Sequence, residues 1–321
     1  MTTQKSPLRI LSTVSSFGQG DPGPISALHD VGFTLVANPH GRKLTEEELV
    51  TLVAEYKPLG LLAGTEPVSR RAMEAAEGAL RVISRVGVGW DNVDHAGAAA
   101  LGIAVRRTEG VLDAAVAELT LGFILAALRH IPAHDRDIRA GVWKKRMGAL
   151  LEDKTVGLVG LGAIGMRVAG LVQAFGAKVL YCDLAERDAC HCTACDLGGL
   201  LAQADIVSLH ASGSSCILGP TEIAGLKPGA IVVNTARGGL IDEEALRLAL
   251  VSGRVGAACL DVFEREPYRG PLAELPNVIL TSHIGSYARE ARNRMEKAAV
   301  ENLLHALDAI EPAPSPQTTR P

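Results

Sequence analysis

Short apolar runs alternate with amphipathic stretches along the first hundred residues. Runs of about four to eight branched apolar residues are typical of strands buried on both faces of a parallel sheet. The predicted strands are Leu8 to Val14, Phe33 to Val36, Leu59 to Ala63, Arg81 to Val86 and Ile103 to Val105. Helices are predicted between them at Glu46 to Tyr56, where Thr45 and Glu48 form a capping box, and at Arg70 to Ala79, where Ser69 is the N-cap. This alternation predicts a doubly wound α/β domain.

A second alternating series begins at Thr155. After its first strand, further strands are predicted at Lys178 to Cys182, Ile206 to Leu209, Ile231 to Asn234, Ala257 to Val262 and Val278 to Leu280. The helix Glu243 to Val251 lies between the N-cap Asp242 and Gly253, and the last helix, Ala288 to Leu307, is expected to return to the first domain. We therefore predict two α/β domains, residues 1–107 with 287–321 and residues 108–286, with a ligand-binding cleft between them.

Between the two series, the segment Asp113 to His130 is helical by length and composition and is apolar on nearly every side. Such a helix must be covered all round. We predict that it packs against both domains and a second copy of the chain, which would make a homodimer. The alternative is a helix buried within a single chain.

Bulk composition describes an ordinary globular protein, with 47% hydrophobic residues and a net charge of -4 over 321 residues. Nothing in it indicates binding to nucleic acid. The most apolar segment, Ala114 to Leu128, contains Glu118 and is too short for a membrane span, and the N-terminus lacks a signal-peptide run. Six cysteines are too few for a disulfide framework, so we predict a cytoplasmic protein without membrane partners. The residues from Glu311 onward are predicted to be disordered.

Glycines at 160, 162 and 165 form a G-x-G-x-x-G motif at a predicted strand-to-helix turn. In this setting the first glycine permits the tight turn, the second lets the backbone approach a pyrophosphate, and the third lets helix and strand pack closely. Asp183 ends the next strand, where a carboxylate accepts hydrogen bonds from an adenosine ribose. No arginine follows it immediately, which favours NAD over NADP. The bland alternative is a glycine turn without a ligand.

Three polar side chains follow successive strands of the second series: Arg237, Glu266 and His283. The carboxyl ends of parallel strands share one edge and lie about 4.8 Å apart, so these side chains can meet. The arginine fork suits a substrate carboxylate, and histidine can exchange a proton near neutral pH. Glu266 would orient the imidazole and favour its charged form. Taken one at a time, each has a structural alternative: the arginine could form a surface ion pair, the glutamate could only shape a turn, and the histidine could be a hydrogen-bonded core residue.

Four ordered motifs resemble the NAD-dependent D-2-hydroxyacid dehydrogenase family: residues 160–165 (GLGAIG), 234–242 (NTARGGLID), 261–267 (DVFEREP) and 282–285 (SHIG). The similarity runs from Leu8 to about Leu307, and residues 84–94 (SRVGVGWDNVD) most resemble the phosphoglycerate dehydrogenase branch. The resemblance implies a Rossmann-type NAD domain inserted into a flavodoxin-like substrate domain, together with a dimer built on the 113–130 helix. It also implies that the catalytic set is Arg237, Glu266 and His283.

The same resemblance assigns the binding residues, including Asp261 for the nicotinamide carboxamide. The expected cofactor contacts are Gly160, Gly162, Ala163, Ile164, Gly165, Asp183, His210, Ala211, Thr235, Ala236, Asp261, His283 and Gly285. The expected substrate contacts are Arg85, Val86, Gly87, Val88, Gly89, Arg237 and His283.

The chain departs from the family pattern in several places. Glu109 and Leu112 replace a common proline and asparagine, and residues 210–214 (HASGS) replace H-x-P-L-T, which affects the expected cofactor contacts there. A basic residue found early in some phosphoglycerate enzymes is replaced near Gly64. Arg85 remains to meet a second anionic group, which favours a phosphorylated or phosphonate-bearing acid. The alternatives are a corepressor-like NAD-sensing protein and a phosphite or formate dehydrogenase, although formate enzymes of this fold lack the Glu at position 266.

Residues 190–195 (CHCTAC) form a cluster of cysteine and histidine near Cys182. The spacing fits no paired C-x-x-C zinc site, and a segment at this position of the fold normally only links a strand to a helix. We therefore favour an ordinary linking segment over a zinc site, and metal analysis of the purified protein would decide between the two.

Overall fold

The computed structural model describes residues 8–185, 187, 191–213 and 215–310. The predicted tail from Glu311 onward lies outside the described residues. The chain divides into two compact units, Met1–Leu112 with Arg289–Pro321 (unit 1) and Asp113–Ala288 (unit 2), each built on one parallel sheet.

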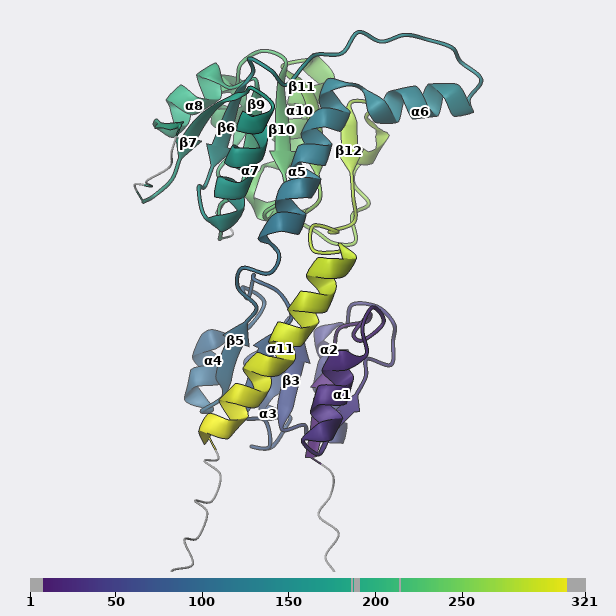
Figure 1. Cartoon of the computed structure of the whole chain (residues 1–321), viewed down its shortest axis with the longest axis vertical. Coiled ribbons are helices and arrows are strands. Elements are labelled where there is room, and N and C mark those ends of the chain that lie inside the picture. Colours follow the sequence, from purple (N-terminus) through teal and green to yellow (C-terminus); the bar gives the residue numbers. More distant parts are fainter. Residues whose placement is uncertain (1–7, 186, 188–190, 214, 311–321) are drawn as a thin grey trace, which may run out of the picture. The chain divides into compact units, whose positions relative to one another are not determined.

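Unit 1, whose helices α1 to α4 and α11 are labelled in Figure 1, contains a five-stranded sheet in the order β2-β1-β3-β4-β5. All its pairs are parallel, and the order is that of flavodoxin-like folds. Its strands are β1 (Leu8–Ser12), β2 (Phe33–Val36), β3 (Gly60–Ala63), β4 (Val82–Arg85) and β5 (Ala104–Arg107). Its helices are α1 (Gly23–Asp30), α2 (Glu46–Tyr56), α3 (Arg70–Glu74), α4 (His95–Ala100) and α11 (Arg289–Ile310).

The last helix, α11, is part of unit 1 although it is far from the other elements in sequence. It packs against β3, β4, β5 and α1. Ala299, Val300 and Leu303 are buried, and the buried Ser84 hydroxyl donates to the Ala299 carbonyl at 2.8 Å. The C-terminal segment therefore completes the core of the unit that begins the chain.

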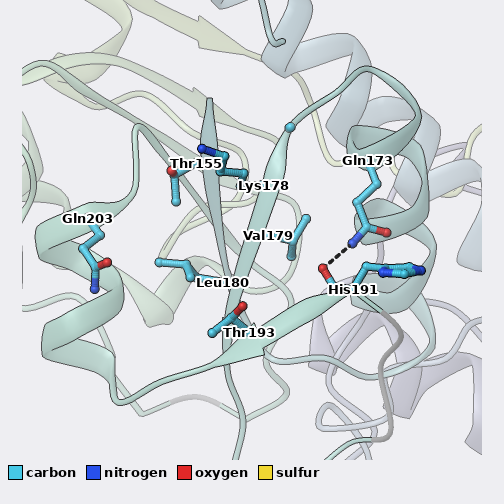
Figure 2. A pocket seen from close by; sticks show the side chains of 9 residues that line it. Thr155, Gln173, Lys178, Val179, Leu180, His191, Thr193 and Gln203 are labelled. Carbon is cyan, nitrogen blue, oxygen red and sulfur yellow. Dashed lines mark hydrogen bonds between the residues drawn. The ribbon is translucent and has the colours of Figure 1, made fainter. Parts of the chain in front are cut away.

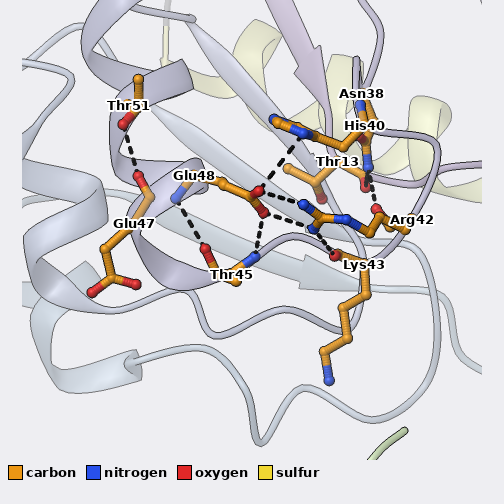
Figure 3. Close-up of polar contacts among 9 residues, drawn as sticks. All are labelled: Thr13, Asn38, His40, Arg42, Lys43, Thr45, Glu47, Glu48 and Thr51. Carbon is orange, nitrogen blue, oxygen red and sulfur yellow. Dashed lines mark hydrogen bonds and ion pairs between the residues drawn. The ribbon is translucent and has the colours of Figure 1, made fainter.

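The N-terminal caps of α2 and α3 follow the sequence, and the Ser69 hydroxyl accepts the Ala72 N–H at 3.3 Å as the predicted N-cap of α3. The Thr45 and Glu48 capping box is present (Figure 3). Arg42 donates to both carboxylate oxygens of Glu48, at 2.9 and 2.6 Å, and this pairing together with the Thr45 N–H lowers the pKa of Glu48 to about 2. The prediction that α3 reaches Ala79 is wrong: it ends at Glu74, because Glu77 and Gly78 adopt positive φ angles of 49° and 81° that a right-handed helix excludes.

Unit 2 contains a seven-stranded parallel sheet in the order β12-β11-β10-β9-β6-β7-β8. Counted from β6, this is the Rossmann order with one strand added. Its strands are β6 (Thr155–Val159), β7 (Lys178–Cys182), β8 (Cys192–Ala194), β9 (Ile206–Leu209), β10 (Ala230–Asn234), β11 (Val255–Leu260) and β12 (Val278–Leu280). Its helices are α5 (Asp113–Leu128), α6 (Ile131–Arg139), α7 (Ala163–Ala174), α8 (Leu197–Gln203), α9 (Pro220–Gly225) and α10 (Glu243–Ser252). The predicted fold class, two doubly wound parallel sheets, is confirmed.

The apolar helix α5 ends at Leu128, because His130 takes a left-handed conformation before α6. It packs against α7, β10 and β11 within unit 2, and Phe123, Ile124 and Ala127 join a buried cluster under the sheet. Among the residues described, no single helix is long and apolar enough to cross a membrane; α5 and α6, bent by 62°, reach that length and composition only as a pair.

Candidate active site

Three neighbouring strands of unit 2 end together and present the three predicted catalytic residues. Asn234, Leu260 and Leu280, the last residues of β10, β11 and β12, are register partners. Arg237, Glu266 and His283 follow these strand ends. The sheet therefore sets the spacing of the three loops that carry them.

His283 and Glu266 form a direct pair. The imidazole Nδ1 lies 3.0 Å from both carboxylate oxygens of Glu266, and the side chains are 42% and 26% exposed. Glu266 also accepts the Phe263 N–H at 3.3 Å, which holds the carboxylate against its own loop. Because Nδ1 is engaged, the ring nitrogen left for chemistry is Nε2.

Asp261 holds the turn that carries His283. Its carboxylate is buried and accepts hydrogen bonds from the Thr281 hydroxyl at 2.5 Å, the Ile284 N–H at 2.7 Å and the Gly285 N–H at 2.8 Å. The His283 N–H donates to the Asp261 carbonyl at 2.9 Å. The resemblance assigns Asp261 to the nicotinamide. In the structure its carboxylate fixes the backbone on either side of the histidine.

Arg237 is placed by the turn after β10. The Asn234 amide donates to the Arg237 carbonyl at 2.7 Å, and the Arg237 Nη1 donates to the Ala236 carbonyl at 2.7 Å. A Cβ on Gly238 would lie 1.9 Å from the carbonyl carbon of Phe263, so only glycine allows this turn to contact the loop after β11. That close approach places the arginine loop next to the loop of Glu266.

The glycine motif forms the turn between β6 and α7. A Cβ on Gly165 would lie 2.4 Å from the Gly160 carbonyl oxygen, so helix and turn pack with no room for a side chain. At Gly162, the N-cap of α7, an added Cβ would meet no protein atom within 4 Å, and no side chain caps the helix. Ala163 and Ile164 are its first two helical residues. The free N–H groups at this open end fit a dinucleotide pyrophosphate.

Asp183 lies directly beside this turn. Its carboxylate accepts the Leu161 N–H at 2.6 Å and the Ala185 N–H at 2.9 Å. Partial burial raises the pKa of Asp183, but these N–H groups and Arg187, 3.7 Å away, outweigh it and keep the pKa below its usual value. The sequence interpretation missed Arg187, because the arginine comes four residues after the acid.

The other predicted cofactor positions lie on the same edge. His210 follows β9, and its ring contacts the Ser208 hydroxyl at 2.9 Å; burial lowers the pKa of this histidine to about 4. Ala211 is adjacent to the Gly160 turn, since its nitrogen would lie 2.7 Å from a Cβ there. Thr235 pairs with the Thr120 hydroxyl of α5 at 2.9 Å, and the Ala236 N–H donates to Asn234.

The predicted substrate loop belongs to unit 1 and follows β4. Val86 N–H donates to the Ala63 carbonyl at 2.9 Å, and Gly87 accepts the Thr108 N–H at 3.1 Å. Val88 and Gly89 continue this loop. Arg85 is 8% exposed, and its Nη1 donates to the Val86 carbonyl and lies against Gly87. Sequence reasoning missed Glu66, which is buried after β3. Its position beyond a strand end was the available signal.

The cysteine cluster shows no metal geometry where it is described. Cys190 lies outside the described residues. In the part of the chain that the structure describes, no group of three histidine, cysteine or acidic side chains could hold a metal ion. Burial raises the pKa of Cys182 and Cys195, which disfavours the thiolate form that metals require.

A cavity of about 470 Å³ lies at the opposite end of β7 from Asp183 (Figure 2). Lys178, His191, Thr193 and Gln203 line it, and Gln173 donates to the His191 carbonyl at 2.8 Å. It contains none of the predicted site residues. This cavity is therefore separate from the predicted catalytic, cofactor-binding and substrate-binding residues.

The strand order, the glycine turn and Asp183 together define a dinucleotide-binding oxidoreductase of the Rossmann type. The family model for the D-isomer specific 2-hydroxyacid dehydrogenase NAD-binding domain matches residues 121–285. The chain is 39% identical over 274 residues to the hydroxypyruvate reductase of Thermotoga maritima, covering 82% of this chain and 89% of that protein. The chain belongs to the D-isomer specific 2-hydroxyacid dehydrogenase family and uses NAD.

Two further similarities extend this result. The chain is 39% identical over 295 residues to the D-3-phosphoglycerate dehydrogenase of Methanocaldococcus jannaschii, covering 88% of this chain but 55% of that protein. It therefore spans about half the length of that relative. The crystal structure of the TT0316 protein from Thermus thermophilus superposes with a TM-score of 0.87 at 37% identity, covering 94% of this chain and 97% of that one. The predicted family, enzyme class and cofactor are confirmed.

Proposed function

We propose that this dehydrogenase interconverts a 2-keto acid and a D-2-hydroxy acid with Arg237, Glu266 and His283 as its catalytic set. The bound nicotinamide supplies or accepts the hydride. Arg237 binds the substrate carboxylate through its planar guanidinium fork, which fixes the orientation of the adjacent carbon. From unit 1, the Val86 to Gly89 backbone would supply further substrate contacts.

His283 moves the proton. In the direction of oxidation its Nε2 takes the hydroxyl proton, and in the direction of reduction it returns that proton to the developing alkoxide. Glu266 holds Nδ1 and stabilises the imidazolium that oxidation forms, since both carboxylate oxygens lie 3.0 Å from this nitrogen. This pair, next to the arginine loop, is the observation that carries the proposal.

The test is NADH oxidation against glyoxylate, hydroxypyruvate, 3-phosphohydroxypyruvate and phosphonopyruvate, with the chirality of the product determined. We expect turnover with at least one of them, and a D-hydroxy acid from any that is turned over except glyoxylate, whose product glycolate is achiral. His283→Ala should lower kcat by about 100-fold or more while leaving the NADH dissociation constant unchanged. His305→Ala on α11, an exposed histidine, is the matched control. An unchanged kcat in His283→Ala refutes the assignment.

The substrate side chain divides two groups of candidates. The hydroxypyruvate reductase relative favours a small uncharged substituent, whereas the phosphoglycerate dehydrogenase relative favours a second anion, as Arg85 suggests from sequence. The panel of keto acids separates them directly, because kcat/KM ranks each substrate by its transition-state binding.

We propose a homodimer that forms through unit 2. Most of α5 is covered within the unit, and the exposed apolar side chains lie on α6 and the segment after it: Ile131, Ile138, Val142, Trp143, Met147 and Leu150. Met147 is 93% exposed. Four of them, Ile131, Ile138, Met147 and Leu150, line a hollow of about 820 Å³ between α6 and this segment. Contiguous apolar surface of this kind is characteristic of protein interfaces.

Sedimentation at micromolar concentration tests the dimer. We expect Ile138→Asp to shift the protein to monomer, because it places a charge in the proposed interface. Leu248→Asp on α10, an apolar residue of similar exposure, is the control and should remain dimeric. A monomeric wild-type protein contradicts the proposal.

A further inference from the structure

Two cysteines of unit 2 lie side by side on the two strands at one edge of its sheet. Tyr181 of β7 and Ala194 of β8 are register partners, and Cys182 and Cys195 are the next residues along each chain. The Cys195 N–H donates to the Tyr181 carbonyl at 2.9 Å, so the pairing of the two chains continues to this point. Neighbouring strands are about 4.8 Å apart, which lies within the Cα separations of about 4.4 to 6.8 Å that a disulfide spans.

The two thiols lie on the same face of the sheet. Cys182 and Cys195 pack against one buried cluster, on the side of α8, whereas Cys192 packs against a second cluster, on the side of α7. Figure 2 shows the same alternation just before Cys182, with Val179 and Leu180 on opposite sides of β7. Burial and, after it, the neighbouring Cys182 raise the pKa of Cys195, so the two sulfurs are close enough to interact. Both residues are partly exposed, which leaves this dithiol within reach of small molecules.

The backbone joins Cys182 to the glycine turn. The Cys182 carbonyl accepts the Gly160 N–H at 2.8 Å, and the next residue, Asp183, accepts the Leu161 N–H at 2.6 Å. Side chains that point the same way from paired strands begin about 4.8 Å apart, whereas a disulfide brings its Cβ atoms to about 3.8 Å. Bonding the two sulfurs therefore draws the ends of β7 and β8 together, and the end of β7 carries both hydrogen bonds to the turn.

We propose that Cys182 and Cys195 are a reversible redox modification site, at which disulfide formation weakens NADH binding. The oxidant is a small-molecule disulfide. One cysteine attacks it as a thiolate and forms a mixed disulfide, and the second cysteine then displaces the other half. The protein loses two electrons to the oxidant, which leaves as two thiols that carry the two protons. The inference rests on the proposed enzyme binding its cofactor at the glycine turn.

The test treats the reduced full-length enzyme with oxidised glutathione at mildly alkaline pH, because burial raises the pKa of both thiols and only the thiolate attacks. Trypsin then releases residues 179–187, in which Cys182 is the only cysteine. We expect mass spectrometry to find this peptide cross-linked to the one that contains Cys195. The NADH dissociation constant, from fluorescence titration, should rise by about threefold to tenfold, the effect of losing one hydrogen bond to the turn. Dithiothreitol should restore it.

Cysteine variants identify the partner of Cys182. Cys195→Ser should abolish the cross-link, and Cys195→Ala replaces it if the serine variant does not fold. Cys182→Ser should keep its NADH affinity after the same treatment. Cys192→Ser, on the same edge strand but the opposite face, and Cys216→Ser, at an exposed position, are the matched controls and should cross-link as wild type does.

The other outcomes separate this inference from the proposed function. A glutathione adduct on Cys182 without a cross-link overturns the inference, as does a cross-link that persists in Cys195→Ser. A cross-link between Cys182 and Cys195 that leaves the NADH dissociation constant unchanged also overturns it. A reduced enzyme that binds NADH but turns over no 2-keto acid refutes the proposed function, whereas the disulfide and its effect on NADH affinity are measured independently of turnover.

Discussion

Replacing Glu266 with glutamine tests how much of the chemistry depends on the paired carboxylate. The substitution keeps the shape and a hydrogen-bond acceptor for His283 but removes the charge that faces the imidazolium. Nδ1 lies 3.0 Å from both carboxylate oxygens. At this distance the Coulomb energy between the imidazolium and the carboxylate is about 1 kcal/mol for an effective dielectric of about 80 and about 5 kcal/mol for one of about 20. The side chains are 42% and 26% exposed, so the lower part of that range, about 1 to 3 kcal/mol, applies.

Oxidation leaves His283 as an imidazolium, so kcat for oxidation should fall between about 5-fold and 150-fold in Glu266→Gln. The assay is steady-state NADH formation from the D-hydroxy acid that the panel identifies, together with NADH affinity from fluorescence titration. Affinity should remain within about twofold, because the carboxylate acts on the proton and not on cofactor binding. Glu264→Gln, the same change on an exposed neighbour in the same loop, should behave as wild type. A kcat within about twofold of wild type would refute the reasoning.

Three other predictions follow from the site. Arg237→Lys loses two-point carboxylate binding and should raise KM for the keto acid by about 10-fold to 100-fold, with NADH affinity unchanged; a KM near wild type contradicts the anchor role. Gly165→Ala would place Cβ 2.4 Å from the Gly160 oxygen, so NADH affinity and Tm should both fall, as fluorescence titration and a thermal melt would measure; normal NADH binding would mean that the turn adapts. Burial lowers the pKa of His210 to about 4 in the folded protein. As pH falls from about 6.5 to 4, the imidazole of this histidine is therefore protonated in the unfolded chain before it is protonated in the folded one. The free energy of unfolding should drop over this range by at most about 3 kcal/mol. In urea unfolding at pH 7 and 4.5, His210→Gln should lose less stability than wild type; an equal loss excludes this histidine as the source.

Much of the fold is readable from sequence because the buried strands are short apolar runs. Leu8–Ser12, Phe33–Val36 and Val278–Leu280 lie within or match the predicted strands, and Arg237, Glu266 and His283 follow strand ends as expected. A residue that follows a strand in sequence can be placed in space without knowing the rest of the fold, because a parallel sheet brings the loops after neighbouring strands together at one edge. The pairing of His283 with Glu266 follows from that rule.

Other features depend on contacts that no local pattern contains. Glu66 follows a strand end, which sequence shows, but its burial beside Thr13 does not follow from the local pattern. The three hydrogen bonds of Asp261 to the turn around His283 join residues 20 to 24 positions apart in sequence, at the ends of the neighbouring strands β11 and β12. The apolar surface of α5 could be covered by its own unit or by a second copy with the same sequence pattern. The end of α3 had one local signal, Gly78, a residue type that favours the left-handed conformation that ends helices, whereas nothing local distinguishes Glu77, the other left-handed residue.

The discontinuity of unit 1 constrains how this polypeptide can be made. A ribosome releases β1 to β5 long before residues 289–310, so the nascent first sheet must wait, with the groove for Ala299, Val300 and Leu303 unfilled, until synthesis is nearly finished. Unit 2 is contiguous and can fold as it emerges. A chain stopped after residue 288 should therefore give a folded dinucleotide-binding unit attached to an aggregation-prone N-terminal one, and supplying the 289–310 helix as a separate peptide should rescue the latter.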